Sequence, residues 1–214
     1  MTSHGFGQEK EGILVVLSGP SGVGKGTVVA CAMSSRNAAA ARLRRSISVT
    51  TRSRRADERE GVDYFFCSPE EFRRKIEANQ LLEWATYLDN SYGTPADWVT
   101  RNRRAGWNVV LEIEVQGARQ VKDRCPEAIL VYMLPPSWRA LQQRLRRRRS
   151  ESEESQRERI AIARREIQAI PEYDYVIVND RVERAARRLL SILDAEHARV
   201  ERTDLRRWLG DVDG

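Results

Sequence analysis

Buried strands and amphipathic helices alternate along most of this chain. Four short runs of consecutive apolar residues are typical of strands that are covered on both faces of a parallel sheet. They span residues 13–17, 108–113, 128–134 and 175–178. Helical patterns lie between these runs or after them. They span about 24–35, from Ser137 onward, 153–170 and 182–199. This alternation predicts an α/β fold, with helices flanking a parallel sheet in three layers.

The rhythm changes between residues 46 and 100. Short strand patterns at 46–50, 62–66 and 81–88 crowd together there without long helices between them. Ser68, followed by Pro69 and then by Glu71, predicts a helix that begins at Pro69, because the serine and the glutamate can cap each other's backbone N–H groups. We therefore expect an inserted subdomain over 46–100.

Composition and charge narrow the class of protein. Hydrophobic residues make up 41% and charged residues 32% of 214 residues, and no apolar stretch is long enough to span a bilayer. The first residues show no secretory signal, and three scattered cysteines suit a reducing compartment, so we expect a cytoplasmic protein without a membrane partner. The net charge of +6 is compatible with nucleotides, nucleic acid or a solvated surface.

A glycine-rich segment, GPSGVGKGT, comes directly after the first apolar run. Glycines let successive backbone N–H groups point into one hollow, and the N-terminus of the next helix favours the same anion. Lys25 is expected to reach the outer phosphates of a nucleoside triphosphate. The predicted triphosphate-binding residues are Gly19, Pro20, Ser21, Gly22, Val23, Gly24, Lys25, Gly26 and Thr27.

Gly26 stands where the strict phosphate-loop pattern has a hydroxyl, which here comes one residue later, at Thr27. Thr27 can still donate to a phosphate. We therefore expect Mg²⁺ to be carried by the nucleotide and water, with no direct protein ligand.

Five segments together resemble the guanylate kinase family. They are GPSGVGKGT, SISVTTRSRRADEREGVDYFF (46–66), LLEWATYLDNSYGTP (81–95), LEIEVQGARQV (111–121) and VIVND (176–180). The resemblance covers about residues 13–195. It implies transfer of the γ-phosphate of ATP to GMP, with Mg²⁺, inside a domain over 12–199. Its expected parts are a core (12–45, 101–136 and 170–199), a GMP-binding subdomain (46–100) and a lid (137–169), between a loose 1–11 and a tail at 200–214.

The acceptor site can be inferred partly from the residues themselves. Arginines and phenols give charge-assisted and neutral donors around a monophosphate. The residues of this kind are Arg52, Arg55, Tyr64 and Tyr92. Glu83, among apolar neighbours, can accept from both N1–H and N2–H of guanine, whereas adenine offers an acceptor at N1. The resemblance adds Ser48, Gly93, Thr94 and Glu112 to the GMP site and leaves the role of Glu114 open.

The segment RLRRRR continues the helix that begins at Ser137. Arg144 and Arg148 lie four residues apart and therefore share one face of a helix. The resemblance implies that Arg144, Arg148 and Arg159 close on ATP and the transferred phosphoryl group as catalytic residues beside Lys25. It also places Asn179 at the adenine of ATP.

Three other functions compete with this interpretation. A guanylate kinase-like module that binds peptides has no need for Lys25 and the arginines of the lid. A nucleic-acid binder would use the arginine-rich helix, but we expect no nucleic-acid partner. The third alternative is a kinase for another monophosphate, and Glu83 is the main residue that argues against it. The sequence leaves the oligomeric state open.

Overall fold

The computed structural model describes residues 11–36, 42–87, 89–146 and 153–203. Its centre is a five-stranded sheet in which every neighbouring pair is parallel. The order across the sheet is β2 (Leu43–Arg45), β7 (Asn108–Glu112), β1 (Leu14–Ser18), β8 (Ile129–Leu134) and β9 (Tyr175–Val178). The predicted parallel α/β fold is confirmed.

Helices cover both faces of this sheet because successive residues of β1 point to opposite sides. Val15 and Leu17 pack on one face with α1 (Lys25–Met33) and α8 (Val182–His197). Leu14 and Val16 pack on the other face with α4 (Ala96–Arg104) and α5 (Val115–Arg124). All four β1 side chains are at most 1% exposed, so the strand lies at the centre of three layers.

A second sheet forms within residues 46–100. Its order is β4 (Phe65–Phe66), β3 (Val49–Thr50), β6 (Asn90–Pro95) and β5 (Leu81–Tyr87), with α3 (Pro69–Glu77) packed against it through Phe72. The predicted start of α3 is confirmed: Ser68 Oγ accepts from Glu71 N–H at 3.1 Å, and Glu71 Oε2 accepts from Ser68 N–H at 2.8 Å.

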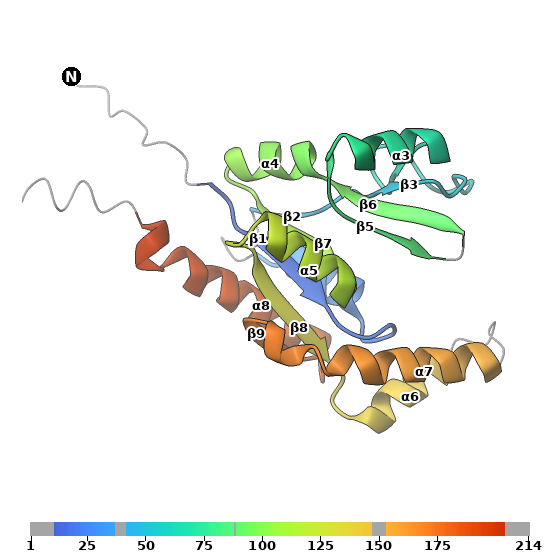
Figure 1. Cartoon of the computed structure of the whole chain (residues 1–214). Coiled ribbons are helices and arrows are strands. Elements are labelled where there is room, and N and C mark those ends of the chain that lie inside the picture. The colour runs from blue at the N-terminus through green and yellow to red at the C-terminus, as the bar shows by residue number, and fades with distance from the viewer. Residues whose placement is uncertain (1–10, 37–41, 88, 147–152, 204–214) are drawn as a thin grey trace, which may run out of the picture.

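Helices α6 (Trp138–Arg146) and α7 (Glu153–Ile167) pack together through Leu141, Leu145 and Ala163. Ser137 Oγ accepts from Ala140 N–H at 3.1 Å, as expected for the cap of α6. In Figure 1, this helix pair lies at the bottom, the second sheet lies at the top, and the loop after β1 lies between them. In this view (Figure 1), the helix pair and the second sheet lie on either side of that loop.

The structure corrects several predicted boundaries. The strand expected at 46–50 is confined to β3, and the helix expected to reach residue 170 ends at Ile167, before a short 3-10 turn over Ile170–Glu172 that contains Pro171. Strands β2 and β6 and helices α4 and α5 were not predicted. β2 is only three residues long and exposes two of them, so its apolar pattern is too short to recognise.

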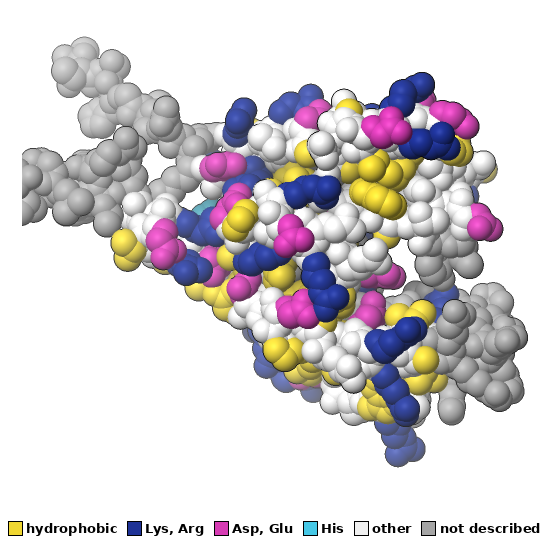
Figure 2. All heavy atoms as spheres, in the orientation of Figure 1, with side chains coloured by type: hydrophobic (Ala, Val, Ile, Leu, Met, Phe, Trp, Pro, Cys, Tyr) yellow, Lys and Arg dark blue, Asp and Glu magenta, His cyan; other side chains and the backbone are white. Residues whose placement is uncertain are grey.

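Charged side chains of both signs are interspersed on the face shown in Figure 2. Several arginines of the described residues form ion pairs, such as Arg119 with Glu172 at 2.6 Å and Arg101 with Asp97 at 2.9 Å. Within the same residues, no helix combines the length and apolar character that crossing a membrane requires.

Candidate active site

The glycine-rich loop joins β1 to α1, and its backbone depends on glycine at two positions. Gly24 precedes α1 with a left-handed φ of 95°, and a Cβ atom there would lie 2.8 Å from the Asn179 amide nitrogen. Gly19 has a φ of 143°, and its Cβ would lie 2.3 Å from the Met133 carbonyl oxygen. Larger residues would push the loop away from β8 and β9.

Lys25 folds back over this loop. Its Nζ donates to the Gly19 carbonyl oxygen at 2.6 Å. Burial lowers the pKa of Lys25, and the carboxylates of Glu166, Glu114 and Glu112 oppose that shift. The ammonium is thus placed in the loop with acidic groups around it.

The helix pair α6–α7 also contacts the glycine-rich loop. Arg144 donates to the Val23 carbonyl at 3.1 Å and to the Asn179 carbonyl at 3.2 Å. Arg159 Nη1 lies 3.4 Å from Ser21 Oγ. Two of the three arginines expected to close on ATP therefore lie beside the loop, and Arg148 lies outside the described residues.

Asn179 comes directly after β9 and is only 3% exposed. Its Nδ2 donates to the Val23 carbonyl at 2.8 Å, so in this structure the amide supports the loop from behind. Contact between Asn179 and adenine stays a prediction.

Glu83 and Thr94 face each other across β5 and β6. Glu83 is 5% exposed, which agrees with the burial expected from its apolar neighbours, and Thr94 Oγ1 donates to its Oε1 at 2.6 Å. Burial raises the pKa of Glu83, while the Thr94 hydroxyl and the Arg124 charge oppose the shift. Oε2 approaches α5 so closely that a Cβ on Gly117 would lie 2.8 Å away.

Arg52 is held by a carboxylate that the sequence analysis missed. Its Nη2 donates to Glu58 Oε1 at 2.6 Å, and the Arg55 backbone N–H donates to Glu58 Oε2 at 2.9 Å. The bond from Arg52 is the main reason that the pKa of Glu58 is lowered. The Arg52 guanidinium also lies 5.4 Å from the centre of the Tyr64 ring, which in turn lies 6.2 Å from Tyr92.

A cavity of about 260 Å³ opens beside these residues. Ser48 and Tyr64 line it together with Glu58 and Glu112. Burial raises the pKa of Glu112, and the positive charges of Arg45 and Lys25 oppose the shift. The cavity therefore brings Ser48 and Tyr64, which directly precede β3 and β4, against Glu112 at the carboxyl end of β7.

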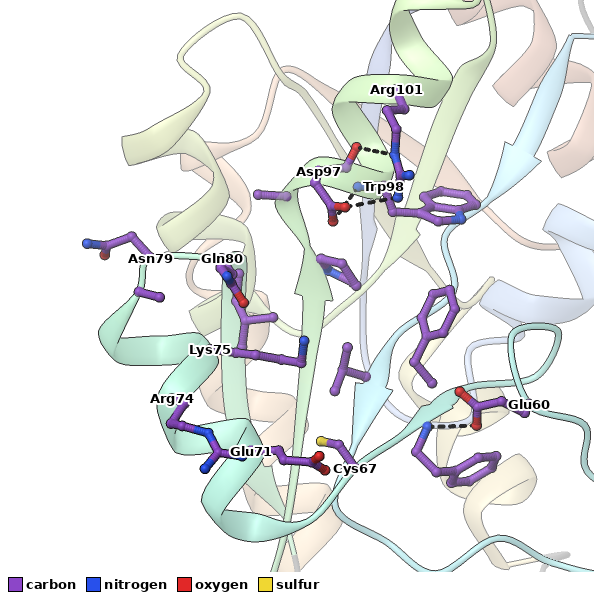
Figure 3. Close-up of a pocket in the computed structure, with 17 residues that line it drawn as sticks. Glu60, Cys67, Glu71, Arg74, Lys75, Asn79, Gln80, Asp97, Trp98 and Arg101 are labelled. Atoms are coloured by element: carbon purple, nitrogen blue, oxygen red, sulfur yellow. Dashed lines mark hydrogen bonds and ion pairs between the residues drawn. The ribbon is translucent and has the colours of Figure 1, made fainter.

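A larger cavity, of about 1050 Å³, lies elsewhere, between α3, β4 and the start of α4 (Figure 3). None of the predicted site residues lines it. Its charged groups include the pair Arg101 and Asp97, and Glu60, which accepts from the Phe66 backbone at 3.1 Å. Size alone therefore does not identify the functional site in this protein.

The family model for guanylate kinase matches residues 11–196 of the chain. The chain belongs to the guanylate kinase family. Among curated relatives, the guanylate kinase of Shouchella clausii is 45% identical over 195 residues, which cover 91% of this chain and 93% of the relative. The guanylate kinase of Desulfitobacterium hafniense is 47% identical and covers 91% and 96%.

A solved structure, the guanylate kinase of Anaplasma phagocytophilum, matches with a TM-score of 0.71 at 31% identity and covers 94% of each chain. The sequence analysis missed two carboxyl groups that lie near the predicted site residues. Besides Glu58, it missed Glu166 of α7, whose pKa is raised to about 7, first by burial and next by Glu114. Glu166 stands in a long polar helical pattern, where nothing marks it from its neighbours.

Not every predicted residue presents a side chain to the site. Gly93 is buried in β6, and a Cβ there would lie 2.9 Å from both the Glu83 carbonyl and Leu81. Thr27 is exposed on the first turn of α1, and Arg55 is exposed as well. Their contacts with nucleotides stay predictions.

Proposed function

We propose that this chain transfers the γ-phosphate of ATP to GMP, giving ADP and GDP, with the site residues described above in named roles. The observation that carries the proposal is the buried Glu83–Thr94 pair, in a guanylate kinase chain whose phosphate loop and Lys25 are intact. One part of the site is built to select guanine and the other to hold a triphosphate.

On the donor side, residues 19–27 wrap the phosphates of ATP and Lys25 leaves Gly19 to contact them. Arg144 and Arg159 approach from α6 and α7, where they already touch the loop through Val23 and Ser21. Arg148 completes this set in the proposal. Phosphoryl transfer depends on positioning and charge neutralisation more than on covalent chemistry, and an inserted arginine can contribute about 10³-fold or more in rate.

On the acceptor side, Arg52, Arg55, Tyr64 and Tyr92 hold the phosphate of GMP. Glu58 keeps Arg52 oriented through the 2.6 Å bond in the free protein. Charge-assisted bonds from arginine to phosphate are about twice as strong as neutral ones. The phosphate is thereby fixed in one position, ready for attack on the γ-phosphate in line with the bond that breaks.

Guanine is selected by Glu83, with Ser48, Thr94 and Glu112 beside it. An ionised Glu83 accepts from N1–H and N2–H, and the hydroxyl of Thr94 favours the ionised form against the effect of burial. Adenine would place its N1 acceptor against the same carboxylate. A site built on such bonds can reject the wrong base by roughly 10⁴-fold.

Mg²⁺ fits this site as an ion that ATP brings with it. Glu112 and Glu114 at the end of β7 would hold its water shell at most. When bound, the ion neutralises charge on the phosphates. We place the reaction in guanine nucleotide metabolism of the cytoplasm.

The test is a coupled assay of ADP release with ATP, Mg²⁺ and, separately, GMP, AMP, UMP and CMP. We expect the wild-type protein to turn over GMP and the Lys25→Ala variant to show no turnover. Turnover with another monophosphate would keep the kinase class and refute the role of Glu83. Absence of turnover with all four would favour a peptide-binding module.

A further inference from the structure

Arg45 is the last residue of β2, and β2 pairs in parallel with β7. Its side chain therefore starts at the carboxyl edge of the sheet, where α/β proteins bind ligands. The preceding Arg44 is structural, since its guanidinium lies 3.6 Å from the Trp107 ring and donates to Asn102 at 2.6 Å. Consecutive strand residues point to opposite faces, so the two arginines have different surroundings.

The Arg45 guanidinium lies between the phosphate loop and the acceptor cavity. Its Nε is 2.8 Å from Glu112 Oε1. A Cβ placed on Gly26 would lie 3.3 Å from Glu112 Oε2 and 4.0 Å from Arg45 Nη2, so both side chains reach the start of α1. The Arg45 side chain nevertheless stays 60% exposed.

The charges around the small cavity distinguish this arginine from an ordinary surface ion pair. Among the described residues that line the cavity, Arg45 is the only basic one, and Glu58, Asp63 and Glu112 are acidic. The proposed function gives Arg52 to the acceptor phosphate as well, but Arg52 is already bonded to Glu58 at 2.6 Å. A phosphate dianion beside three carboxylates therefore needs a further cation to offset their repulsion. Arginine has five donors in a planar fork, so it can keep Glu112 on one edge and bind an oxyanion on the other.

We propose that Arg45 is a further phosphate-contacting residue, which binds the phosphate of the acceptor nucleotide where it meets the phosphate loop. The inference rests on the proposed function and deepens it. In the free protein Arg45 is held by Glu112. In the complex its Nη groups donate to the acceptor phosphate and offset the acidic wall of the cavity.

Calorimetric titration with GMP and with guanosine, both without ATP, tests this contact. In Arg45→Gln the Kd for GMP is expected to rise about tenfold or more, the effect of one charge-assisted hydrogen bond, while the Kd for guanosine stays unchanged. Arg187→Gln, which removes one exposed positive charge from α8, is the matched control and should change neither Kd.

An equal loss for GMP and guanosine would mean that Arg45 acts only through Glu112, and an unchanged Kd for GMP would mean no contact; either result overturns the inference. If wild type turns over GMP, both results leave the proposed function intact. Circular dichroism melting checks the fold. Should Arg45→Gln unfold, Arg45→Lys replaces it in the test, because lysine keeps the charge without the planar fork of donors. The Kd for GMP should then rise by a smaller factor, and the Kd for guanosine should again stay unchanged.

Discussion

At the scale of single residues, the site gathers carboxyl groups whose burial opposes their ionisation. Glu83, Glu112 and Glu166 all have raised pKa values, and burial is the largest cause for each. Folding therefore makes it costly to ionise these groups, and the proposed selection of guanine requires Glu83 to be ionised. The site is expected to reduce the stability of the fold in return for its charge pattern.

The raised pKa of Glu166 predicts how the stability of the fold should change with pH. Its pKa is about 7 in the folded protein and near the ordinary 4.5 when unfolded. Below both values the group is protonated in either state, and as pH rises the unfolded state loses the proton first, so the fold becomes relatively less stable. Glu166→Gln should thus gain stability over wild type from about pH 5 upward, reaching on the order of 1 kcal/mol above pH 7 after allowance for partial exposure.

Chemical denaturation at pH 5, 6, 7 and 8 measures this difference. Glu77→Gln, at an exposed position late in α3, is the control and should show no such trend. A gap between Glu166→Gln and wild type that is constant or shrinks with pH would contradict the assigned environment of Glu166.

At the scale of elements, the phosphate loop is supported by helix α6 and by the residue directly after β9. Asn179 and Arg144 both donate to the Val23 carbonyl, and Arg144 also reaches the Asn179 carbonyl. The Val23 carbonyl is thereby held by one donor from α6 and one beside β9, while the Val23 N–H donates to the Pro20 carbonyl within the loop at 3.1 Å. Support from behind couples the shape of the loop to the end of the sheet.

Asn179→Ala should therefore destabilise the fold by about 0.5–1.5 kcal/mol, because the buried Val23 carbonyl loses one of its two donors and keeps Arg144. We also expect the KM for ATP to rise several-fold while the KM for GMP changes little. Thermal melting and initial rates measure the two effects, with the exposed Gln168→Ala as the control. A rise confined to the KM for GMP would place Asn179 on the wrong side of the site.

The cap at the start of helix α3, by contrast, stabilises the fold without contacting the predicted site. Ser68→Ala removes the bond from Glu71 N–H to Ser68 Oγ, keeps the bond from the backbone N–H of residue 68 to Glu71, and should cost about 1 kcal/mol of stability. Because the cap bonds only Ser68 to Glu71 and neither is a predicted site residue, kcat should stay unchanged in the folded protein. Loss of kcat larger than the loss of folded protein would link α3 to catalysis.

At the scale of the whole molecule, the positions of four buried strands along the chain and of the phosphate loop could be predicted, because continuous apolar runs and glycine spacing are local signals. The burial of Glu83 could be inferred from its neighbours in the same way. Strand β6 could not be predicted, since Gly93 and Pro95 weaken its pattern and only pairing with β3 and β5 makes it a strand. Arg45, Glu58 and Glu166 acquire their roles through partners that lie far away in sequence or on a neighbouring turn.

In the proposed function, this molecule phosphorylates GMP and selects guanine through Glu83. The most direct measurement is the ratio of kcat/KM for GMP to that for AMP, in wild type and in Glu83→Gln. We expect a wild-type ratio of roughly 10⁴ that falls at least tenfold in the variant, with the KM for ATP unchanged. An unchanged ratio in a folded, active Glu83→Gln protein would contradict it.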